Sequence, residues 1–410
     1  MSLSYCCQWE FRSIFSLAPM TEGAVASICF PTQATTALII NNMTRFDVAI
    51  IGGGIIGCAL ARVLAGENLR VCVIDRGAPG NEASGAAAGM LSPSAEAEKD
   101  NPLFQLSRAS LNLYRALTDE LVAETGIDPQ YRTEGTIVVL TDEQDRDRMV
   151  QTVEWQRSLG VPVEQLSSQQ LRELEPALSE PAAAFFFPQD HQIDNRLLMH
   201  ALVQSCRQRG VEFVLGRDAV AVQRNGHGVA GVDLQDGRIA APRVINSSGA
   251  WAAAIRVPGL APPPIRPVKG HMLALQGPSG VLRHVVRTAR VYLVPRWDGR
   301  VLVGSTMEEA GFDKTPRAGP LTGLLRNAQL LCPALEQCEI AEYWTGLRPA
   351  APDGLPLLGP TELEGYWFAL GHFRNGILLA PITAAILSGW FLTGHTSIPM
   401  ESFSPSRFAT

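Results

Sequence analysis

Short apolar runs and helical spacings alternate along the chain beyond its first 44 residues. Residues 46–51 (FDVAII) and 70–74 (RVCVI) are short and apolar, which is typical of buried strands in a parallel sheet. Between them, residues 58–65 (CALARVLA) have helical spacing, and Gly66 can end that helix. This order predicts a strand–helix–strand unit at the start of an α/β fold.

The middle of the chain follows a different pattern. Residues 136–141 (TIVVLT) predict a strand, two polar helical segments follow, and residues 194–209 predict an amphipathic helix. After the stiff break at residues 262–264 (PPP), residues 267–275 and 291–304 alternate like antiparallel strands. The pattern therefore predicts two interleaved lobes, one built on a parallel sheet and one mainly antiparallel.

Two stretches poor in charge need a separate interpretation. Residues 1–44 carry only Glu10, Arg12 and Glu22 as charges and show no clean apolar period. This favours a dispensable extension, or a start at Met43, over a transit or export segment. Residues 377–392 are apolar but interrupted by polar, Gly and Pro residues, which favours a buried helix over a membrane span.

Composition narrows the class of protein. The 410 residues carry 34 Lys plus Arg and 40 Asp plus Glu, a net charge of −6, which argues against a nucleic-acid binder. With 46% hydrophobic residues the chain can bury a large core. The eight cysteines form no C-x-x-C pair and no Cys/His ligand set, so we expect no metal site and a reducing cytoplasm.

A glycine motif follows the first predicted strand. Gly52, Gly54 and Gly57 form G-x-G-x-x-G, and Asp75 ends the second strand. Gly52 permits the tight turn, Gly54 lets a pyrophosphate approach the backbone, and Gly57 lets the helix pack on the strand. The helix N-terminus then favours a phosphate, and the carboxylate suits ribose hydroxyls. We expect dinucleotide binding here rather than a purely structural turn.

A second match to the same motif serves as a control. Residues 226–231 (GHGVAG) also read G-x-G-x-x-G, but they lie between two short strand-like runs and no helix follows. We therefore expect a hairpin or a glycine-rich loop there, with no cofactor.

The carboxylate of Asp75 suits the adenosine ribose of FAD or of NAD and argues only against NADP. The choice between FAD and NAD therefore depends on the sequence after Asp75. Residues 82–91 (EASGAAAGML) are rich in small side chains, so their backbone could approach a phosphate or a ring system closely. A tightly packed small-residue helix would have the same composition.

The chain resembles a known family at four places. These places are GGGIIG with VIDRG and ASGAAAGML, VINSSGAW at 244–251, WTGLRP with DGLP after it, and GHFRNGIL at 371–378. They resemble motifs of the FAD-dependent D-amino-acid oxidase group. Among these enzymes the glycine oxidases of thiamine biosynthesis are the most similar. The resemblance covers residues 46 to 393 approximately, and its last two motifs are the most specific.

The resemblance implies a set of functional residues. Arg348 is expected to hold a substrate carboxylate, Arg374 to lie near the same anion, and Tyr292 to close over it. Gly85 departs from the family pattern, where a bulkier residue is common. The glycine motif and the resemblance together give these residues for non-covalently bound FAD: Gly52, Gly54, Ile55, Ile56, Gly57, Asp75, Arg76, Ser84, Gly85, Ala88, Gly89, Met90, Val220, Gly249, His372, Phe373, Arg374, Asn375, Gly376, Ile377 and Leu378.

The chemistry of the residues agrees with this resemblance. A planar guanidinium can clamp an α-carboxylate with two parallel hydrogen bonds and so orient the α-carbon over a flavin. Flavin itself performs the redox step, so we expect no catalytic side chain. A helix opening near Gly376 would direct its positive end at the ring. His271 and His284 lack partners at ligand spacing and are expected to have a satisfied polar or surface role.

These observations predict the domains. Residues 1–44 lie outside the fold, and the FAD-binding domain takes 45–133, 194–262 and 341–395. The substrate domain takes 134–193 and 263–340, and 396–410 form a tail. The substrate pocket is expected between the two lobes.

We predict an oxidase that deaminates glycine and other small amines or amino acids. The resemblance implies hydride transfer from the α-carbon to flavin, an imine that gives glyoxylate and ammonia, reduction of O2 to H2O2, and supply of the imine for the thiazole of thiamine. No nucleic-acid partner and no membrane span are expected, and the oligomeric state stays open. The alternatives are a D-amino-acid or sarcosine oxidase or dehydrogenase that passes electrons to a quinone or carrier, and a non-catalytic flavin-binding protein.

Overall fold

The computed structural model describes residues 45–97, 101–142, 145–226, 228–396 and 398–408. The expected N-terminal extension and His227 of the second glycine motif lie outside the described residues. The described residues all belong to one compact unit.

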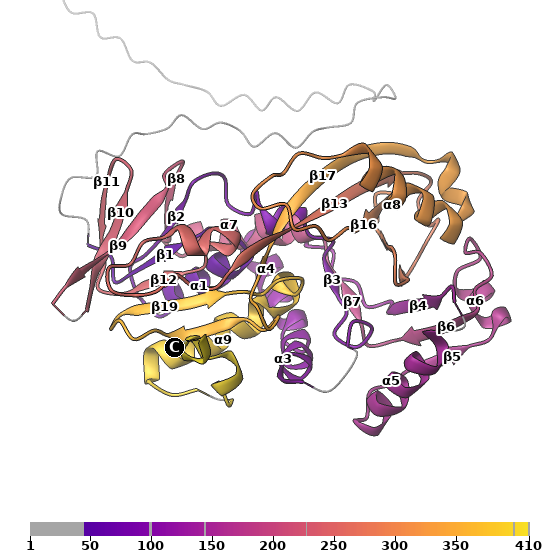
Figure 1. Cartoon of the computed structure of the whole chain (residues 1–410), viewed down its shortest axis with the longest axis horizontal. Helices are drawn as coiled ribbons and strands as arrows, with labels where there is room; N and C mark the ends of the chain where they lie inside the picture. The colour runs from indigo at the N-terminus through magenta and orange to yellow at the C-terminus, as the bar shows by residue number, and fades with distance from the viewer. Residues whose placement is uncertain (1–44, 98–100, 143–144, 227, 397, 409–410) are drawn as a thin grey trace, which may run out of the picture. The chain divides into compact units, whose positions relative to one another are not determined.

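The predicted strand–helix–strand unit lies in a six-stranded sheet (Figure 1). β1 pairs in parallel with β2 on one side and with β12 on the other, and β18 alone runs antiparallel at one edge. The order along the sheet is β18 (Leu357–Pro360), β19 (Tyr366–Leu370), β12 (Val244–Asn246), β1 (Val48–Ile51), β2 (Val71–Asp75) and β8 (Glu212–Leu215). Because parallel strands end at one edge, the residues after β1, β2, β12 and β19 come together.

Helices cover this sheet and form the larger core with it. α1 (Ile55–Gly66) packs against α7 (Asn195–Gln208) and α9 (Gly376–Thr393). α3 (Pro102–Leu111) contacts α9, and α4 (Tyr114–Thr125) contacts α7. By length and composition α9 could cross a membrane, but most of its residues are buried against these neighbours. The prediction of a buried helix there is confirmed.

The second glycine motif lies in a hairpin. It lies where β9 (Ala219–Asn225) meets β10 (Gly228–Leu234), and these strands pair antiparallel. β11 (Gly237–Ala240) completes a three-stranded sheet beside β10. The prediction of a hairpin is therefore confirmed.

An eight-stranded, mainly antiparallel sheet forms the other lobe. Its long strands β13 and β17 lie side by side along one edge (Figure 1). The order is β17 (Glu339–Ala350), β13 (Arg266–Gln276), β16 (Arg300–Gly304), β15 (Tyr292–Pro295), β14 (Val285–Arg287), β4 (Thr136–Leu140), β6 (Ala183–Phe187) and β5 (Glu164–Leu166). The strands predicted over 136–141, 267–275 and 291–304 are all confirmed as members of this sheet.

β17 joins the eight-stranded sheet although residues 341–350 fall in the segment that we assign to the FAD-binding domain. It pairs with β13 from Arg266 to Gln276 and completes its backbone hydrogen bonds there, which a sequence pattern cannot reveal. The bounds of the two domains stay a prediction.

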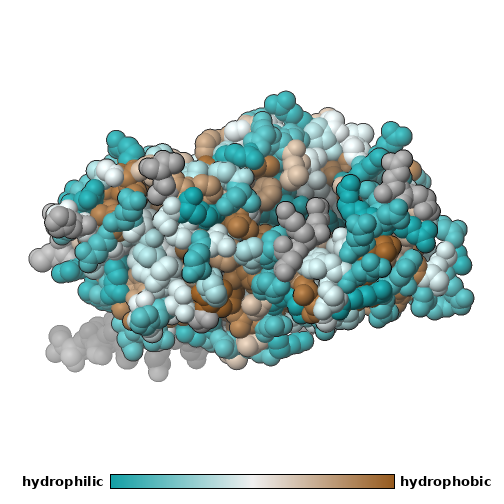
Figure 2. Space-filling model, turned by 60° about the horizontal axis from the view of Figure 1, so that its bottom comes forward, coloured by the Kyte–Doolittle hydropathy of each residue, from teal (hydrophilic) through white to brown (hydrophobic). Residues whose placement is uncertain are grey.

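Smaller elements surround the two sheets. α5 (Arg146–Ser158) and α6 (Ser168–Leu174) are the two predicted polar helices, and α8 (Ala318–Leu331) packs on β13 and β16. α2 (Ala83–Ala86) lies in the small-residue run, and β3 (Met90–Leu91) pairs with β7 (His191–Gln192). The face in Figure 2 is mostly hydrophilic, with scattered apolar residues.

Candidate active site

A cavity of about 520 Å³ lies at the carboxyl edge of the six-stranded sheet. Gly52, Asp75, Ser247 and Gly371 line it, and each of them follows or ends a parallel strand. Residues of β13, β15 and β17 close the other side of the cavity. The cavity therefore lies where the two sheets meet, at the place where open α/β sheets bind ligands.

The glycine turn at the end of β1 leaves no space for side chains. Gly52 has φ +104°, and a Cβ there would lie 2.5 Å from the carbonyl oxygen of Ser247. Gly54 caps α1, and the Ile55 N–H donates to Ser84 Oγ over 2.9 Å. A bare backbone is thus exposed to the cavity beside the first turn of α1.

Asp75 presents a fixed carboxylate at the end of β2. Oδ2 accepts a hydrogen bond from the Gly53 N–H at 2.7 Å, and Oδ1 accepts one from the Gly77 N–H at 2.8 Å. Burial raises the pKa of Asp75, and these two hydrogen bonds oppose that rise. Each oxygen keeps a second lone pair, which a ribose hydroxyl can use.

Arg76 and Trp251 form one wall of the cavity. The guanidinium carbon of Arg76 lies 3.5 Å from the centroid of the Trp251 ring, and Arg76 pairs with Glu82 at 2.7 Å. Trp251 and Glu82 line the cavity too, although we did not predict either as a site residue. Trp251 belongs to the VINSSGAW motif, so that motif was the available signal.

The N-terminus of α9 opens into the cavity. Asn375, Gly376 and Ile377 line it, and no side chain caps the helix. Beside them His372 is buried, with Nε2 3.0 Å from Thr383 Oγ1. Burial lowers the pKa of His372 to about 3, so the ring is neutral at pH 7. The site thus offers a positive helix end without a charged histidine.

Arg348 lies at the opposite end of the cavity. Its guanidinium donates to Ser305 Oγ at 2.6 Å and to the carbonyl oxygen of Thr306 at 3.1 Å. Burial lowers the pKa of Arg348, and Tyr292 opposes this effect. Glu96 also raises the pKa of Arg348, but among the described residues no carboxylate forms an ion pair with Arg348, so its guanidinium can bind an anionic ligand.

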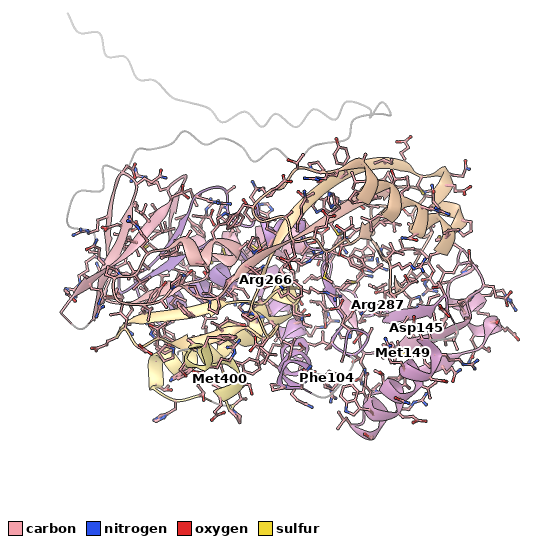
Figure 3. All side chains as sticks on the ribbon, in the orientation of Figure 1. Phe104, Asp145, Met149, Arg266, Arg287 and Met400 are labelled. Atoms are coloured by element: carbon pink, nitrogen blue, oxygen red, sulfur yellow. The ribbon has the colours of Figure 1, made fainter. Side chains whose placement is uncertain are left out.

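Tyr292 and Arg374 also reach this end. The Tyr292 hydroxyl donates to Met272 Sδ at 3.2 Å, and Arg374 pairs with Glu96 at 3.1 Å. Glu96 also lies 3.7 Å from the guanidinium of Arg287. Figure 3 labels Arg287, which belongs to β14, the strand that pairs with β4. Unlike Arg348, Arg374 therefore already has a carboxylate partner.

The structure brings most of the predicted residues to this cavity, and three lie outside its wall: Gly57, Gly85 and Leu378. A Cβ on Gly57 would lie 1.9 Å from the carbonyl oxygen of Gly52, which fits its predicted packing role. A Cβ on Gly85 would lie 2.7 Å from the carbonyl oxygen of Gly80. Leu378 is buried, and its carbonyl accepts a hydrogen bond from Ser110. The predicted residues that line the cavity are Gly52, Gly54, Ile55, Ile56, Asp75, Arg76, Ser84, Ala88, Gly89, Met90, Val220, Gly249, Tyr292, Arg348, His372, Phe373, Arg374, Asn375, Gly376 and Ile377.

Several lining residues carried no recognisable sequence signal. Gly270, Met272, Ser305 and Glu96 line the substrate end of the cavity. Gly270 and Met272 belong to β13, and Ser305 directly follows β16, which pairs with β13. Glu96 lies in a turn outside the helices and strands.

The cavity fits FAD on three observations. Gly52 and Gly54 of the turn after β1 line the cavity with bare backbone, Asp75 offers oxygen acceptors beside it, and α9 directs its N-terminus into the same cavity. A pyrophosphate, a ribose and an electron-rich ring are the groups that these features favour.

Comparison with known proteins supports this assignment. The model of a family described as FAD dependent oxidoreductase matches residues 47–390. Glycine oxidase of Geobacillus kaustophilus is 35% identical over 367 residues, 88% of this chain and 97% of that protein. Its crystal structure superposes with a TM-score of 0.85 and covers 89% of this chain and all of that one.

Two further relatives carry other names. The bifunctional protein ThiO/ThiG of Synechocystis is 36% identical over 90% of this chain, but the match spans 55% of that longer protein. Hydrogen cyanide synthase subunit HcnC of Pseudomonas aeruginosa is 32% identical over 88% of this chain and 96% of that protein. The chain therefore belongs to the FAD-dependent oxidoreductase family, as an enzyme homologous to the glycine oxidases that uses FAD as its cofactor.

Proposed function

We propose that this enzyme oxidises glycine and other small amines or amino acids. The observation that carries the proposal is Arg348, a half-buried guanidinium at the cavity that forms no ion pair with a carboxylate among the described residues. A cation that has lost part of its hydration without gaining an ion-pair partner is stabilised by a bound anion. An α-carboxylate has the planar shape that a guanidinium binds with two hydrogen bonds.

The two lobes divide the work in this proposal. The turn after β1, Asp75 and the start of α9 hold the cofactor, while Tyr292 and Arg348 come from the eight-stranded sheet and hold the substrate. Ser305 and Thr306 fix the direction of the Arg348 guanidinium, so the carboxylate has one orientation. The rest of the substrate is then directed toward the cofactor.

When bound, FAD supplies the redox chemistry by accepting a hydride from the α-carbon and passing the electrons to O2. The balanced reaction is glycine with O2 and water to glyoxylate, ammonia and H2O2. Residues of the chain bind and orient the substrate, and the neutral His372 adds no charge beside the cofactor. The similarity to a bifunctional ThiO/ThiG protein supports the further proposal that the imine product serves thiamine synthesis. Five free cysteines among the described residues support a cytoplasmic location.

Anaerobic bleaching of the bound flavin tests the proposal. Glycine, sarcosine and D-alanine are mixed with the yellow holoenzyme without oxygen, and the flavin absorbance is followed. We expect bleaching by at least one of them and stoichiometric H2O2 when air is admitted. A flavin that no small amine bleaches would overturn the proposal. Bleaching that only a quinone or dye reverses would instead identify a dehydrogenase.

A further inference from the structure

Residues 305–317 form a strap between β16 and α8, and the strap holds Arg348 in place. It contains no helix or strand, only one bridge from Glu308 to Lys269. Its first two residues supply both acceptors for Arg348, Ser305 Oγ at 2.6 Å and the Thr306 carbonyl at 3.1 Å. The position of these two acceptors therefore depends on how the strap is fixed.

The imidazole of His271 fixes the strap at both ends. This side chain of β13 is fully buried, and its Nε2 accepts a hydrogen bond from the Arg317 backbone N–H at 3.1 Å. Since Nε2 is an acceptor, the ring proton lies on Nδ1, which faces Thr306 Oγ1 at 3.0 Å and Glu308 at 3.1 Å. The ring of His271 thus links the two ends of the strap, at Thr306 and at Arg317.

Lys269, two residues earlier on β13, holds the middle of the strap. Its Nζ is buried, donates to the Thr315 carbonyl at 2.5 Å and lies 3.5 Å from Asp313. Its backbone exchanges two hydrogen bonds of 2.9 Å with Glu308. Because side chains alternate along a strand, Lys269 and His271 point to the strap while Gly270 between them lines the cavity.

The far part of the strap reaches the cofactor wall of the cavity. Phe312 stacks on Trp251 with ring centroids 5.6 Å apart, and Lys314 pairs with Glu82 at 2.9 Å. These two contacts are exposed, in contrast to the buried contacts of His271, so we expect them to contribute less to the position of the strap.

We propose that His271 is a positioning residue for carboxylate binding: its neutral ring holds Thr306 and Ser305 where they direct the Arg348 guanidinium at the substrate. The inference rests on the proposed function in one respect, that the ligand of Arg348 is a carboxylate. It adds a residue that touches neither substrate nor cofactor, because His271 does not line the cavity.

The proposal predicts a dependence on pH. Burial lowers the pKa of His271, Glu308 opposes this, and Lys269 and Arg317 add to it, while its partner on β17, Thr345, is uncharged. Protonation would place a hydrogen on Nε2, directly opposite the Arg317 N–H, so the two donors would repel each other. The strap should therefore loosen as the pH falls below the ordinary histidine range.

Acetate binding to the holoenzyme tests the proposal without any turnover. Acetate is titrated from pH 8 down to the lowest pH at which the holoenzyme keeps its flavin, and binding is followed by the change in the flavin spectrum. In the unchanged protein we expect the dissociation constant to rise as the pH falls. His271→Leu should raise it about tenfold at pH 7.5, the effect of roughly one lost buried hydrogen bond, and should abolish the histidine inflection. With substrate, KM should rise by the same factor while kcat changes much less.

Two variants and one control complete the experiment. His271→Gln keeps an acceptor for the Arg317 N–H, so it should restore most of the affinity but remain independent of pH. If His271→Leu fails to retain flavin, Thr306→Val takes its place in the titration. This variant removes the Oγ1 contact with His271 and should also weaken acetate binding. His284→Gln alters another buried histidine, which pairs with Glu175 at 2.8 Å. This control should leave acetate affinity and its pH profile unchanged.

The outcomes separate this inference from the proposed function. If acetate affinity and its pH profile are the same in His271→Leu, His271→Gln and the unchanged protein, the inference is wrong, whether or not glycine is oxidised. If the variants shift acetate binding while no amine bleaches the flavin, the inference stands and the proposed function fails.

Discussion

The Arg348 guanidinium lies directly over Gly270 of the neighbouring strand. Arg348 of β17 pairs with Val268 of β13, so Gly270 is the next residue on the same face of the sheet. A Cβ at position 270 would lie 2.2 Å from Nη1 and 2.7 Å from Cζ of Arg348. The absence of one methyl group therefore allows the arginine to adopt its position at the cavity.

Gly270→Ala should displace the Arg348 guanidinium and weaken carboxylate binding. We expect KM to rise about tenfold or more, because the bonds to Ser305 and Thr306 cannot form with the displaced side chain. Flavin content should stay the same. Gly319→Ala in α8 is the matched control, since its Cβ meets nothing within 4 Å. Equal KM values for both variants would contradict this role of Gly270.

Replacing Arg348 itself should affect substrate more than cofactor. Arg348→Met removes a charged hydrogen-bond donor, so we expect kcat/KM to fall roughly 10- to 100-fold, the range for charge-assisted bonds of about 1.5–3 kcal/mol. Steady-state kinetics measures the loss. Arg287→Met removes an arginine that does not line the cavity and should have a much smaller effect. The interpretation fails if both substitutions reduce kcat/KM equally.

Gly52→Ala should prevent FAD binding. The position has φ +104°, which disfavours any side chain, and the added Cβ would clash with the Ser247 carbonyl at 2.5 Å. The flavin-to-protein absorbance ratio after purification measures the effect. Gly228→Ala lies in the second glycine motif, where the nearest atom would be 3.6 Å from the Cβ, and should retain full flavin content.

Buried His372 should make the fold sensitive to acid. Burial lowers its pKa to about 3, whereas the unfolded chain has the ordinary value of 6.5. Between these values only the unfolded state binds the proton, so the free energy of unfolding should fall by about 2 kcal/mol from pH 7 to pH 5. Urea unfolding at both pH values measures this.

The variant His372→Asn should make the fall from pH 7 to pH 5 smaller by about 2 kcal/mol, while the share of His191, whose pKa burial lowers to about 4, remains. His395 is exposed, so His395→Gln should leave the pH dependence as it was. A slope that His372→Asn leaves unchanged would assign the acid sensitivity to another group.

Local sequence was sufficient for the cofactor half of the molecule. The turn after β1, Asp75 and the start of α9 are each contained in one short contiguous motif, because a strand followed by a glycine turn and a helix determines its own geometry. For the same reason the second glycine motif at 226–231 could be distinguished from the cofactor motif, since it lies between two antiparallel strands and not between a strand and a helix. Family resemblance then indicated Arg348, Tyr292 and Arg374 as single positions.

What surrounds those single positions was decided only by the tertiary structure. Gly270 and Ser305 are far from Arg348 in sequence, and they contact it because β13 pairs with β17 and the strap crosses β13. His271 is linked to Arg348 only through Thr306. The same pairing places residues 341–350 in the eight-stranded sheet. Strand register and buried polar contacts are long-range properties, and a chain determines them only when its sheets have formed.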